Sequence, residues 1–264
     1  MSKKNTETIK RVIYQAVFYV FLIALWQGLF YIGTTVFHWW KPYAFPAPVG
    51  VWRSLVSMVR QNLLFTAVLL SARRALIGYL MSIVIGAVAG LIIARFRVIS
   101  IALKPLILGI QTLPSVCWVP FAILWFGLTE NSILFVVIIG STFSIAIAVE
   151  AAIRNVNPLY IKAAKTMGAK AGTLYFRVVL PASLPALITG LKQGWSFAWR
   201  ALMSAEVMSA TIGLGQTLMM GRDLADINRV TLIILIIILI GVIVEKLVFS
   251  IVEERVLRQI GFVK

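Results

Sequence analysis

The sequence predicts an all-α, polytopic membrane protein with six transmembrane helices and one long polar loop. Of the 264 residues, 61% are hydrophobic and only 13% are charged, whereas a soluble domain carries about 25% charged residues. The apolar residues form runs long enough to span a bilayer, which takes about 20 helical residues. The basic residues, which give a formal net charge of +16, lie at the ends of these runs. We therefore expect one transmembrane domain over residues 1–264.

The first span is expected over residues 12–36. The polar segment before it has no small-residue cleavage site that follows a short apolar region, so we expect no removable signal peptide. After the span, Pro42, Pro46 and Pro48 exclude a continuous helix. Apolar and basic residues then occur at helical spacing over residues 51–60, which predicts a short helix at the membrane interface.

The second span is expected over residues 63–94. Its Gly86 and Gly90 form a GxxxG pattern, which lets a neighbouring helix approach closely. Arg73 and Arg74 lie near the outer end of the same span. Their long side chains either extend to the membrane surface or line a path through the protein.

The third and fourth spans are expected over residues 105–127 and 133–149, after a short basic turn at residues 95–104. Pro114 and Pro120 must kink or break the third span, because a proline inside a helix removes one hydrogen bond and clashes with the preceding turn. Such breaks are tolerated in a membrane where protein, and not lipid, receives the freed carbonyl groups.

The fifth span, residues 184–210, is the least apolar, and a loop over residues 211–228 is expected to follow it. The sixth span, residues 230–252, is nearly pure Ile, Leu and Val, so we expect it to face lipid. Arg200 and Glu206 lie within the fifth span. A charge at the bilayer centre costs roughly 2.5–3.5 kcal/mol on insertion scales, so both side chains should face protein or water.

Arg200 and Glu206 are six residues apart, which is about 600° around a helix, so they are poor partners for each other. Two hypotheses remain open for their role. Both side chains tie helices together, or they line the transport path. In the second case Arg200 attracts an anion, and Glu206 holds an outer gate closed through a basic residue such as Arg73 or Arg74.

The polar loop is expected over residues 150–183 and carries its own helix signals. Asn157 can cap a helix, and Pro158 suits the first helical position. Apolar residues then recur at helical spacing as far as Gly168, which suits a left-handed helix end. A second short helix is expected over residues 169–178 and should stop before the Leu-Pro pair that follows. Together these helices form a compact basic docking surface on the membrane.

The distribution of Lys and Arg predicts the orientation, because cytoplasmic loops carry an excess of basic residues. With the N-terminus in the cytoplasm, six spans return the C-terminus there. The inside segments then carry sixteen Lys and Arg residues, and the outside loops carry five. We therefore expect both termini and the polar loop in the cytoplasm.

The spacing within the polar loop resembles the EAA loop of ABC-transporter permeases. That pattern is Glu-Ala-Ala, three residues, Gly, nine residues, an aliphatic residue, one residue and Leu-Pro. The chain matches it at Ala163, Ala164, Gly168, Val178, Leu180 and Pro181, and it departs from it at Lys162, where the family usually has Glu. The resemblance implies that these residues, together with Pro158, couple the chain to an ATPase. An upstream Glu150-Ala151-Ala152 lacks the later Gly and Leu-Pro, so we interpret it as a chance match.

Other segments resemble the nitrate/sulfonate/bicarbonate (taurine-type) subfamily of these permeases. The resemblance covers roughly residues 45–260 and rests on Phe45-Pro46-Ala47-Pro48, on Leu113-Pro114, on the run from Pro120 to Gly127, and on Glu206 followed by Gly213-Leu214-Gly215. It implies a homodimer in the plasma (inner) membrane of a prokaryote, with two cytoplasmic ABC ATPases and an extracytoplasmic substrate-binding protein. ATP and Mg would bind to the ATPases, with no cofactor in this chain.

The same resemblance implies an importer that works by alternating access. Its solute would be small and anionic, of the nitrate, bicarbonate or sulfonate class. Relatives also carry thiamine-pyrimidine precursors and riboflavin, so such a compound is an alternative. The solute stays open on the sequence alone, because a permease usually selects weakly after its binding protein has selected.

The residues themselves offer no catalytic machinery. No G-x-x-x-x-G-K-[ST] phosphate loop occurs, and no nucleophile–base pair or carboxylate cluster is evident. The single Cys117 and the single His38 predict no metal site, and no nucleic-acid motif accompanies the basic residues. Two alternatives from other classes are a membrane-embedded enzyme and an ion-coupled secondary transporter. The first lacks an intramembrane cluster of His, Asp or Ser, and the second lacks inverted repeats and paired intramembrane acids.

Overall fold

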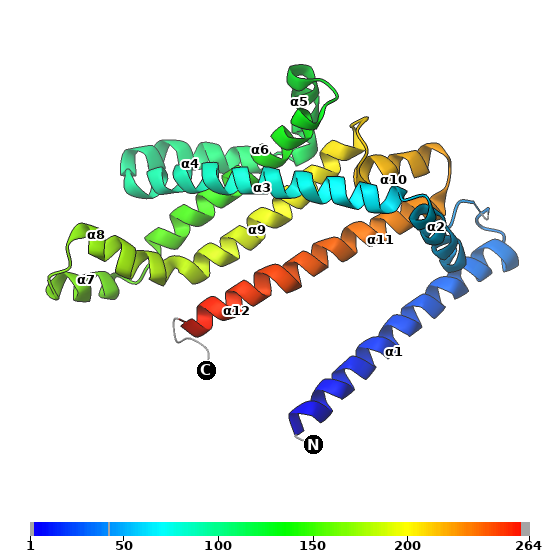
Figure 1. Ribbon diagram of the computed structural model, residues 1–264, viewed down its shortest axis with the longest axis horizontal. Coiled ribbons are helices and arrows are strands. Elements are labelled where there is room, and N and C mark those ends of the chain that lie inside the picture. The colour runs from blue at the N-terminus through cyan, green and yellow to red at the C-terminus, as the bar shows by residue number, and fades with distance from the viewer. Residues whose placement is uncertain (1–2, 42, 260–264) are drawn as a thin grey trace. The chain divides into compact units, whose positions relative to one another are not determined.

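The computed structural model describes residues 3–41 and 43–259, so Pro42 and the end of the predicted charged tail lie outside the described residues. Every regular element in these ranges is a helix, in agreement with the predicted all-α class (Figure 1). Contacts divide the chain into two units, which we describe separately. The first comprises residues 1–65 and 217–236, and the second comprises residues 66–216 and 237–264.

Five helical segments within the described residues are long and apolar enough to cross a membrane: Ile13–Val36, Leu63–Arg95, Glu130–Arg154, Ala171–Val207 and Ile227–Val256. A sixth crossing results if one bent pair of helices counts as a single span. The segments follow the order of the predicted spans and extend beyond most of their limits. The count of six and the orientation stay predictions.

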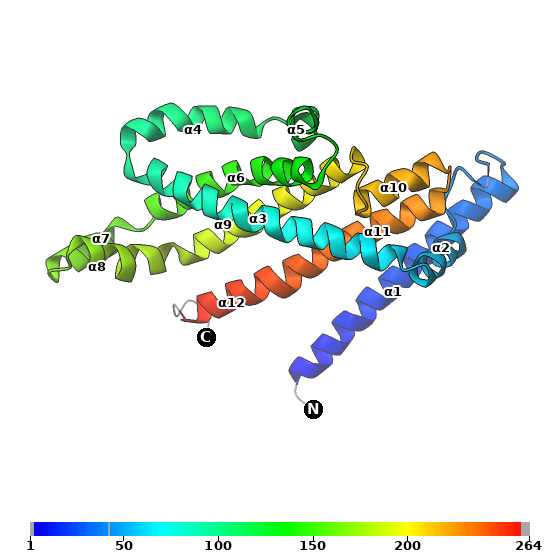
Figure 2. The same ribbon diagram turned by 45° about the horizontal axis from the view of Figure 1, so that its top comes forward.

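The bent pair occupies the place of the third predicted span, 105–127. α4 covers Arg97–Gln111, a short 3₁₀ helix covers Ser115–Trp118, and α5 covers Val119–Phe126. The two parts are bent by 99°, and Figure 2 shows the turn between α4 and α5. The break lies beside Pro114, which has an extended backbone with ψ at 137°. The third span is therefore broken and not merely curved.

Two predictions for this region are wrong. Pro120 does not kink a span, because it lies in the first turn of α5, where no helical partner is needed for the missing N–H group. The basic turn at residues 95–104 is reduced to Phe96, which has an extended backbone between α3 (Leu63–Arg95) and α4. Residues 97–104 contain neither Gly nor Pro, so nothing in them stops a helix.

The second unit is organised around α6 (Glu130–Arg154) and α9 (Leu180–Val207), which run side by side (Figure 1). α3 packs on α6 through its glycines. A Cβ atom on Gly86 would lie 2.9 Å from the Thr142 carbonyl oxygen, and one on Gly90 would lie 2.5 Å from the Ala146 carbonyl oxygen. The close approach predicted from the GxxxG pattern is confirmed.

The expected stop before Leu180 and Pro181 is wrong. α8 (Ala171–Leu174) continues through a π-helical turn over Tyr175–Val179 into α9. The Leu180 N–H group donates to the Tyr175 carbonyl five residues back. The regular α-helical hydrogen bonds of α9 begin only after this wider turn. Pro181 therefore lies in the first turn of α9, where a proline is tolerated.

The C-terminal region is also more helical than predicted. The loop expected over residues 211–228 contains α10 (Leu214–Asp223). α11 (Ile227–Val244) passes through a second π-helical turn at Glu245–Phe249 into α12 (Ser250–Gln259). The charged tail is therefore helical as far as Gln259.

The first unit contains α1 (Lys3–Tyr31), a π-helical turn over Ile32–Val36 and α2 (Pro48–Arg60), the short helix predicted after the first span. Two hydrogen bonds hold the proline-rich segment before α2. Trp26 Nε1 donates to the Pro46 carbonyl at 3.0 Å. The Ala47 N–H group donates to Asn228 Oδ1, also at 3.0 Å, and so ties this segment to the start of α11.

Candidate functional site

The polar loop, which is predicted to couple the chain to an ATPase and is called the coupling loop below, begins with α7 (Pro158–Thr166), whose two ends follow the sequence signals. The Asn157 side chain accepts a hydrogen bond from the Leu159 N–H group at 2.9 Å, so the predicted cap is confirmed. At the other end Gly168 has a φ angle of +80°, which confirms the predicted left-handed residue. The helix therefore ends in a conformation that favours glycine over most other residues.

Two backbone hydrogen bonds complete the end of α7. The Gly168 N–H group donates to the Lys165 carbonyl, and the Ala169 N–H group donates to the Ala164 carbonyl, each at 3.0 Å. This pair of bonds defines the Schellman motif, which satisfies the last carbonyls of a helix and turns the chain sharply. The chain leaves α7 in a fixed direction toward α8.

The loop exposes a mixed apolar and basic surface, which we call the coupling surface. Met167 is 87% exposed, Phe176 is 71% exposed and Leu159 is 65% exposed. Four basic side chains are also exposed: Lys162, Lys165, Lys170 and Arg177. Exposed apolar side chains rimmed by charge are typical of a protein contact site. Lys162 and Ala163 lie in α7, whereas Val178 lies in the π-helical turn and Leu180 and Pro181 begin α9.

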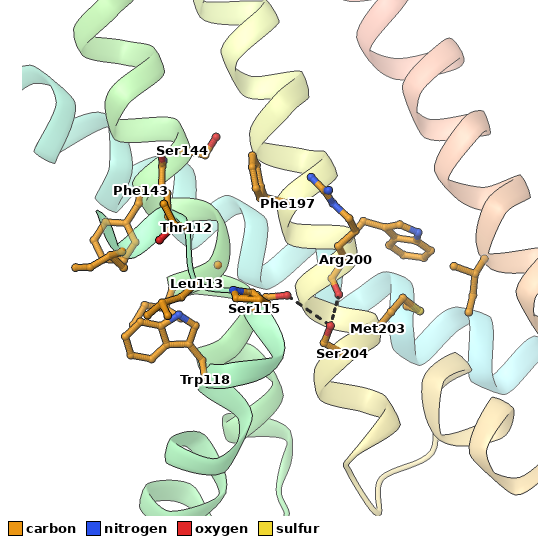
Figure 3. Close-up of a pocket in the computed structure, with 17 residues that line it drawn as sticks. Thr112, Leu113, Ser115, Trp118, Phe143, Ser144, Phe197, Arg200, Met203 and Ser204 are labelled. Carbon is orange, nitrogen blue, oxygen red and sulfur yellow. Dashed lines mark hydrogen bonds between the residues drawn. The ribbon is translucent and has the colours of Figure 1, made fainter. Parts of the chain in front are cut away.

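A cavity of about 580 Å³ lies in the second unit at the break between α4 and α5 (Figure 3). Residues 110–115 and Trp118 form one wall, and α6 and α9 supply most of the rest. Its polar lining includes Ser115 and Ser204, whose hydroxyl oxygens are 3.5 Å apart. Trp118, Phe143 and Phe197 add aromatic surface. The volume suits a small organic or inorganic solute.

Arg200 is the one charged side chain among the described residues that line this cavity (Figure 3). Its Nε atom donates to the Ser196 carbonyl at 3.0 Å. The guanidinium carbon lies 4.7 Å from the centre of the Phe197 ring, a cation–π distance. No ion pair within the described residues includes Arg200. Arg200 is exposed, and a guanidinium without a counter-ion that lines a cavity attracts anions.

Glu206 is held in a different place and has no exposed surface. Arg74 Nη1 donates to Glu206 Oε1 at 2.9 Å. The Ser71 hydroxyl donates to both carboxylate oxygens, at 2.8 Å and 2.7 Å. The Gly215 N–H group, in the first turn of α10, donates to Oε2 at 3.0 Å. The carboxylate therefore lies at a helix N-terminus, where backbone N–H groups and the helix dipole stabilise an anion.

The two arginines of α3 have separate environments. Arg74 is 3% exposed, and besides Glu206 it donates to Glu130 Oε1 and to the Ile212 carbonyl. Arg73 is exposed. Of the two candidate partners for Glu206, the structure therefore places Arg74, and not Arg73, at the carboxylate. It keeps Arg200 apart from this network, as the spacing within one helix predicts.

The sequence reasoning missed three members of this network and one buried acid elsewhere. Ser71 gave no signal, since a serine in a span is common. Glu130 follows a predicted span without any sign of a partner, and Gly215 was recognised only as part of the Gly213-Leu214-Gly215 motif. Glu150, interpreted as part of a chance match, is 1% exposed and lies in two ion pairs. An acid at the end of an apolar run, four residues before Arg154, was the available signal.

A second, basic pocket lies in the first unit, between α2 and the start of α11. It has a volume of about 280 Å³ and is lined by Arg53, Ser54, Ser57, Met58, Gln61, Asp226 and Arg229. The Nε and Nη2 atoms of Arg229 are shielded from water and have no hydrogen-bond partner in the described structure. A buried polar group is usually hydrogen-bonded to protein or to an ordered water, so these atoms are free to bind a water molecule, an ion or another ligand.

No group of three His, Cys, Asp or Glu side chains that could hold a metal lies within the described residues. The fold and these sites define an α-helical membrane transport protein with a cavity at a broken helix and an exposed helical loop. Residues 82–258 match the family of binding-protein-dependent transport system inner membrane components. The chain therefore belongs to this family.

Relatives support the same assignment. A Methanocaldococcus jannaschii protein named as an ABC transporter permease is 32% identical over 67% of each chain. A Bacillus subtilis protein named as an aliphatic sulfonates transport permease is 27% identical over 90% of this chain and 84% of its own. The nitrate import permease of Leptolyngbya laminosa is 26% identical over 70% of this chain and 66% of its own. The resemblance to this permease subfamily is confirmed.

The fold also matches solved transporters. The methionine ABC transporter, solved in inward-facing conformations, has a chain that aligns with a TM-score of 0.61 at 18% identity, over 74% of this chain and 96% of that one. At this identity the likeness shows the fold alone. The chain is thus an ABC importer permease subunit and not an enzyme, and ATP hydrolysis belongs to a separate subunit.

Proposed function

We propose that this permease imports a small anionic solute of the nitrate, bicarbonate or sulfonate class by alternating access. The observation that carries the proposal is Arg200, an unpaired cation that lines the cavity at the break between α4 and α5. Ser115 and Ser204 line the same cavity and can donate hydrogen bonds to an oxyanion. The names of the sulfonate and nitrate relatives agree with this chemistry.

The assembly we propose is a homodimer in the inner membrane of a prokaryote, with two ATPases that bind ATP and Mg. The coupling surface, which is predicted to face the cytoplasm, supplies both apolar anchors and positive charge for an ATPase. α5 exposes Leu124 at 81% and Trp125 at 62%, which offers apolar surface to lipid or to a second copy. In this scheme closure of the ATPases moves α7 and α8, and the movement opens or closes the cavity.

The substrate-binding protein, in this proposal, docks on the predicted outer side at the basic pocket of α2 and α11. Arg53, which is exposed, lines that pocket together with Arg229, and a guanidinium group can bind a carboxylate through two hydrogen bonds. We therefore expect acidic side chains on the binding protein. The double variant Arg53→Gln, Arg229→Gln should weaken its binding and make the remaining binding less dependent on salt. Unchanged affinity would exclude this pocket as the docking site.

One observation favours a second candidate solute. Trp118, Phe143 and Phe197 line the same cavity, and aromatic rings can stack on a thiamine-pyrimidine precursor or a riboflavin-like compound. Such a solute would depend on the rings more than on Arg200. The two candidates therefore predict different sensitive residues.

The test is ATP-driven uptake in vesicles that contain the permease, its ATPase and its binding protein. For an anion, Arg200→Gln should assemble normally and lose uptake by roughly tenfold or more, the factor expected for one charge-assisted hydrogen bond. Arg222→Gln is the control, because Arg222 is exposed and pairs only with the exposed Asp223 within the described structure. It removes the same charge from a residue that is not part of the cavity lining.

Other outcomes separate the alternatives. If Arg200→Gln keeps its uptake while Phe143→Ala and Trp118→Ala lose it, the solute is aromatic and the anion proposal fails. If Arg200→Gln loses uptake only in proportion to lost assembly, Arg200 is a structural residue.

A further inference from the structure

The cytoplasmic end of α6, as the orientation is predicted, contains a buried carboxylate shared by two cations. Glu150 is 1% exposed. Its Oε2 atom accepts a hydrogen bond from Lys104 Nζ of α4 at 2.9 Å. Its Oε1 atom lies 3.2 Å from Arg154 Nε, one turn further along α6. Arg154 Nη2 in turn donates to the Ile93 carbonyl near the end of α3, at 3.1 Å.

This cluster lies between the cavity and the coupling loop. On one side, α6 ends at Arg154, and Asn157 caps α7 three residues later. On the other side, α4 continues from Lys104 through Pro105 to Gln111, which lines the cavity. Seven residues of helix span about 10 Å. One continuous helix therefore connects the Lys104 ion pair to the cavity wall.

The exposure of the two cations allows the ion pair between Lys104 and Glu150 to break and to form again. Glu150 is shielded from water, but the side chains of Lys104 and Arg154 are 38% and 39% exposed. Either cation can therefore leave the carboxylate for water while the other stays and neutralises it. An apolar contact between α4 and α6 would have no cation that can move from the carboxylate to water. A fully buried pair could not open either, because breaking it would leave an uncompensated charge.

We propose that Glu150 is a positioning residue that transmits movement of the coupling loop to the cavity wall through its bond to Lys104, while Arg154 keeps the buried carboxylate neutralised. This inference rests on the proposed function, since it assumes that the loop moves with an ATPase. When the loop displaces the end of α6, Glu150 carries Lys104 with it, and α4 shifts the segment from Ile110 to Pro114. Loss of the Lys104 bond leaves the loop and the cavity intact but uncoupled.

The variant that tests the proposal is Lys104→Met, because it keeps the length of the side chain, and Glu150 keeps Arg154. We expect normal assembly with the ATPase, continued ATP hydrolysis and at least a tenfold loss of solute moved per ATP. Lys104→Arg should retain the coupling. The matched control is Lys192→Met, which removes another partly exposed ion pair of the same unit, Lys192–Glu245 at 3.0 Å, with no link to α4. The control should keep its transport per ATP.

A second measurement follows the cavity wall directly. In a Cys117→Ser background, a Gln111→Cys variant is labelled with a maleimide in the presence and absence of ATP. We expect a labelling rate that responds to ATP in the parent protein and not in the Lys104→Met variant. Equal transport per ATP and equal labelling response in Lys104→Met and the parent would overturn the inference. A parent protein with no ATP-driven uptake at all would instead overturn the proposed function.

Discussion

Arg74 and Glu206 form an ion pair of 2.9 Å in which both side chains are nearly inaccessible to water. The carboxylate is also held by Ser71 and by the start of α10, and the guanidinium is also held by Glu130. One residue from each of α3, α6 and α9 thus meets at the predicted outer end of the second unit. That Glu206 holds an outer gate closed through Arg74 stays a prediction.

Arg74→Met should therefore destabilise the protein strongly, because it leaves Glu206 buried without its cation. We expect a loss of about 3–5 kcal/mol, the range measured when one partner of a buried pair is removed. The measurement is thermal denaturation of the purified permease in detergent. Arg73→Met is the neighbouring control, since Arg73 is exposed and its loss should change stability by about 0.5 kcal/mol or less. Equal effects of the two variants would contradict the assignment.

Gly168→Val should strain the end of α7 by about 1 kcal/mol or more, because its φ angle of +80° disfavours a β-branched residue. No atom would contact a Cβ there, so the effect comes from the backbone alone. We expect normal membrane insertion with weaker ATPase association or transport. Gly168→Asn should be tolerated, since Asn accepts a left-handed conformation, and Gly172→Ala, at an equally open position, serves as the control. Normal transport by Gly168→Val would show that the turn does not position the docking surface.

Gly90→Ala should weaken the packing of α3 on α6, since the added Cβ would lie 2.5 Å from the Ala146 carbonyl oxygen. Such overpacking costs about 1–3 kcal/mol. The yield of folded protein and its midpoint of thermal denaturation report this loss. Gly109→Ala in α4 is the control, because a Cβ there meets nothing within 4 Å. A midpoint for Gly90→Ala that matches the control would mean that the helices lie further apart than described.

The orientation is tested by cysteine labelling in intact cells. Because Cys117 is exposed, it is first replaced by Ser. A cysteine placed at Ala47 should then react with an impermeant reagent from outside, whereas one placed at Lys170 should react only after the membrane is opened. The expectation follows from the excess of basic residues in the predicted inside segments. The reverse pattern would overturn the orientation and with it the docking of an ATPase on the coupling surface.

The sequence was most informative where the structure depends on neighbours along the chain. The cap at Asn157, the left-handed Gly168 and the break beside Pro114 depend on backbone constraints within a few residues. The prediction that the helix stops before Pro181 was wrong because it used only the proline itself as a signal. A proline signals a helix boundary, but the π-helical turn before it let the helix continue. No residue pattern marked that turn.

The candidate sites were only partly predictable, because their geometry comes from contacts between distant segments. Ser71, Glu130, Glu206 and Gly215 belong to four different helices of the described structure, and their meeting depends on how those helices pack. Glu150 was interpreted as a chance match to a loop motif. Its partner Lys104 lies 46 residues earlier, so no local pattern indicated the ion pair. Arg200 was recognised from its charge in an apolar span, but the cavity beside it was not.

The bond between the Glu206 carboxylate and the Gly215 amide restricts which insertions the gene can accept. This hydrogen bond connects the end of α9 to the first turn of α10, across a sequence separation of nine residues. One added or deleted residue would displace the amide by up to about 3.8 Å, the distance between successive Cα atoms. In related genes that encode both residues, we therefore expect differences in length to fall in other loops, such as the one before α2, and not between these two codons.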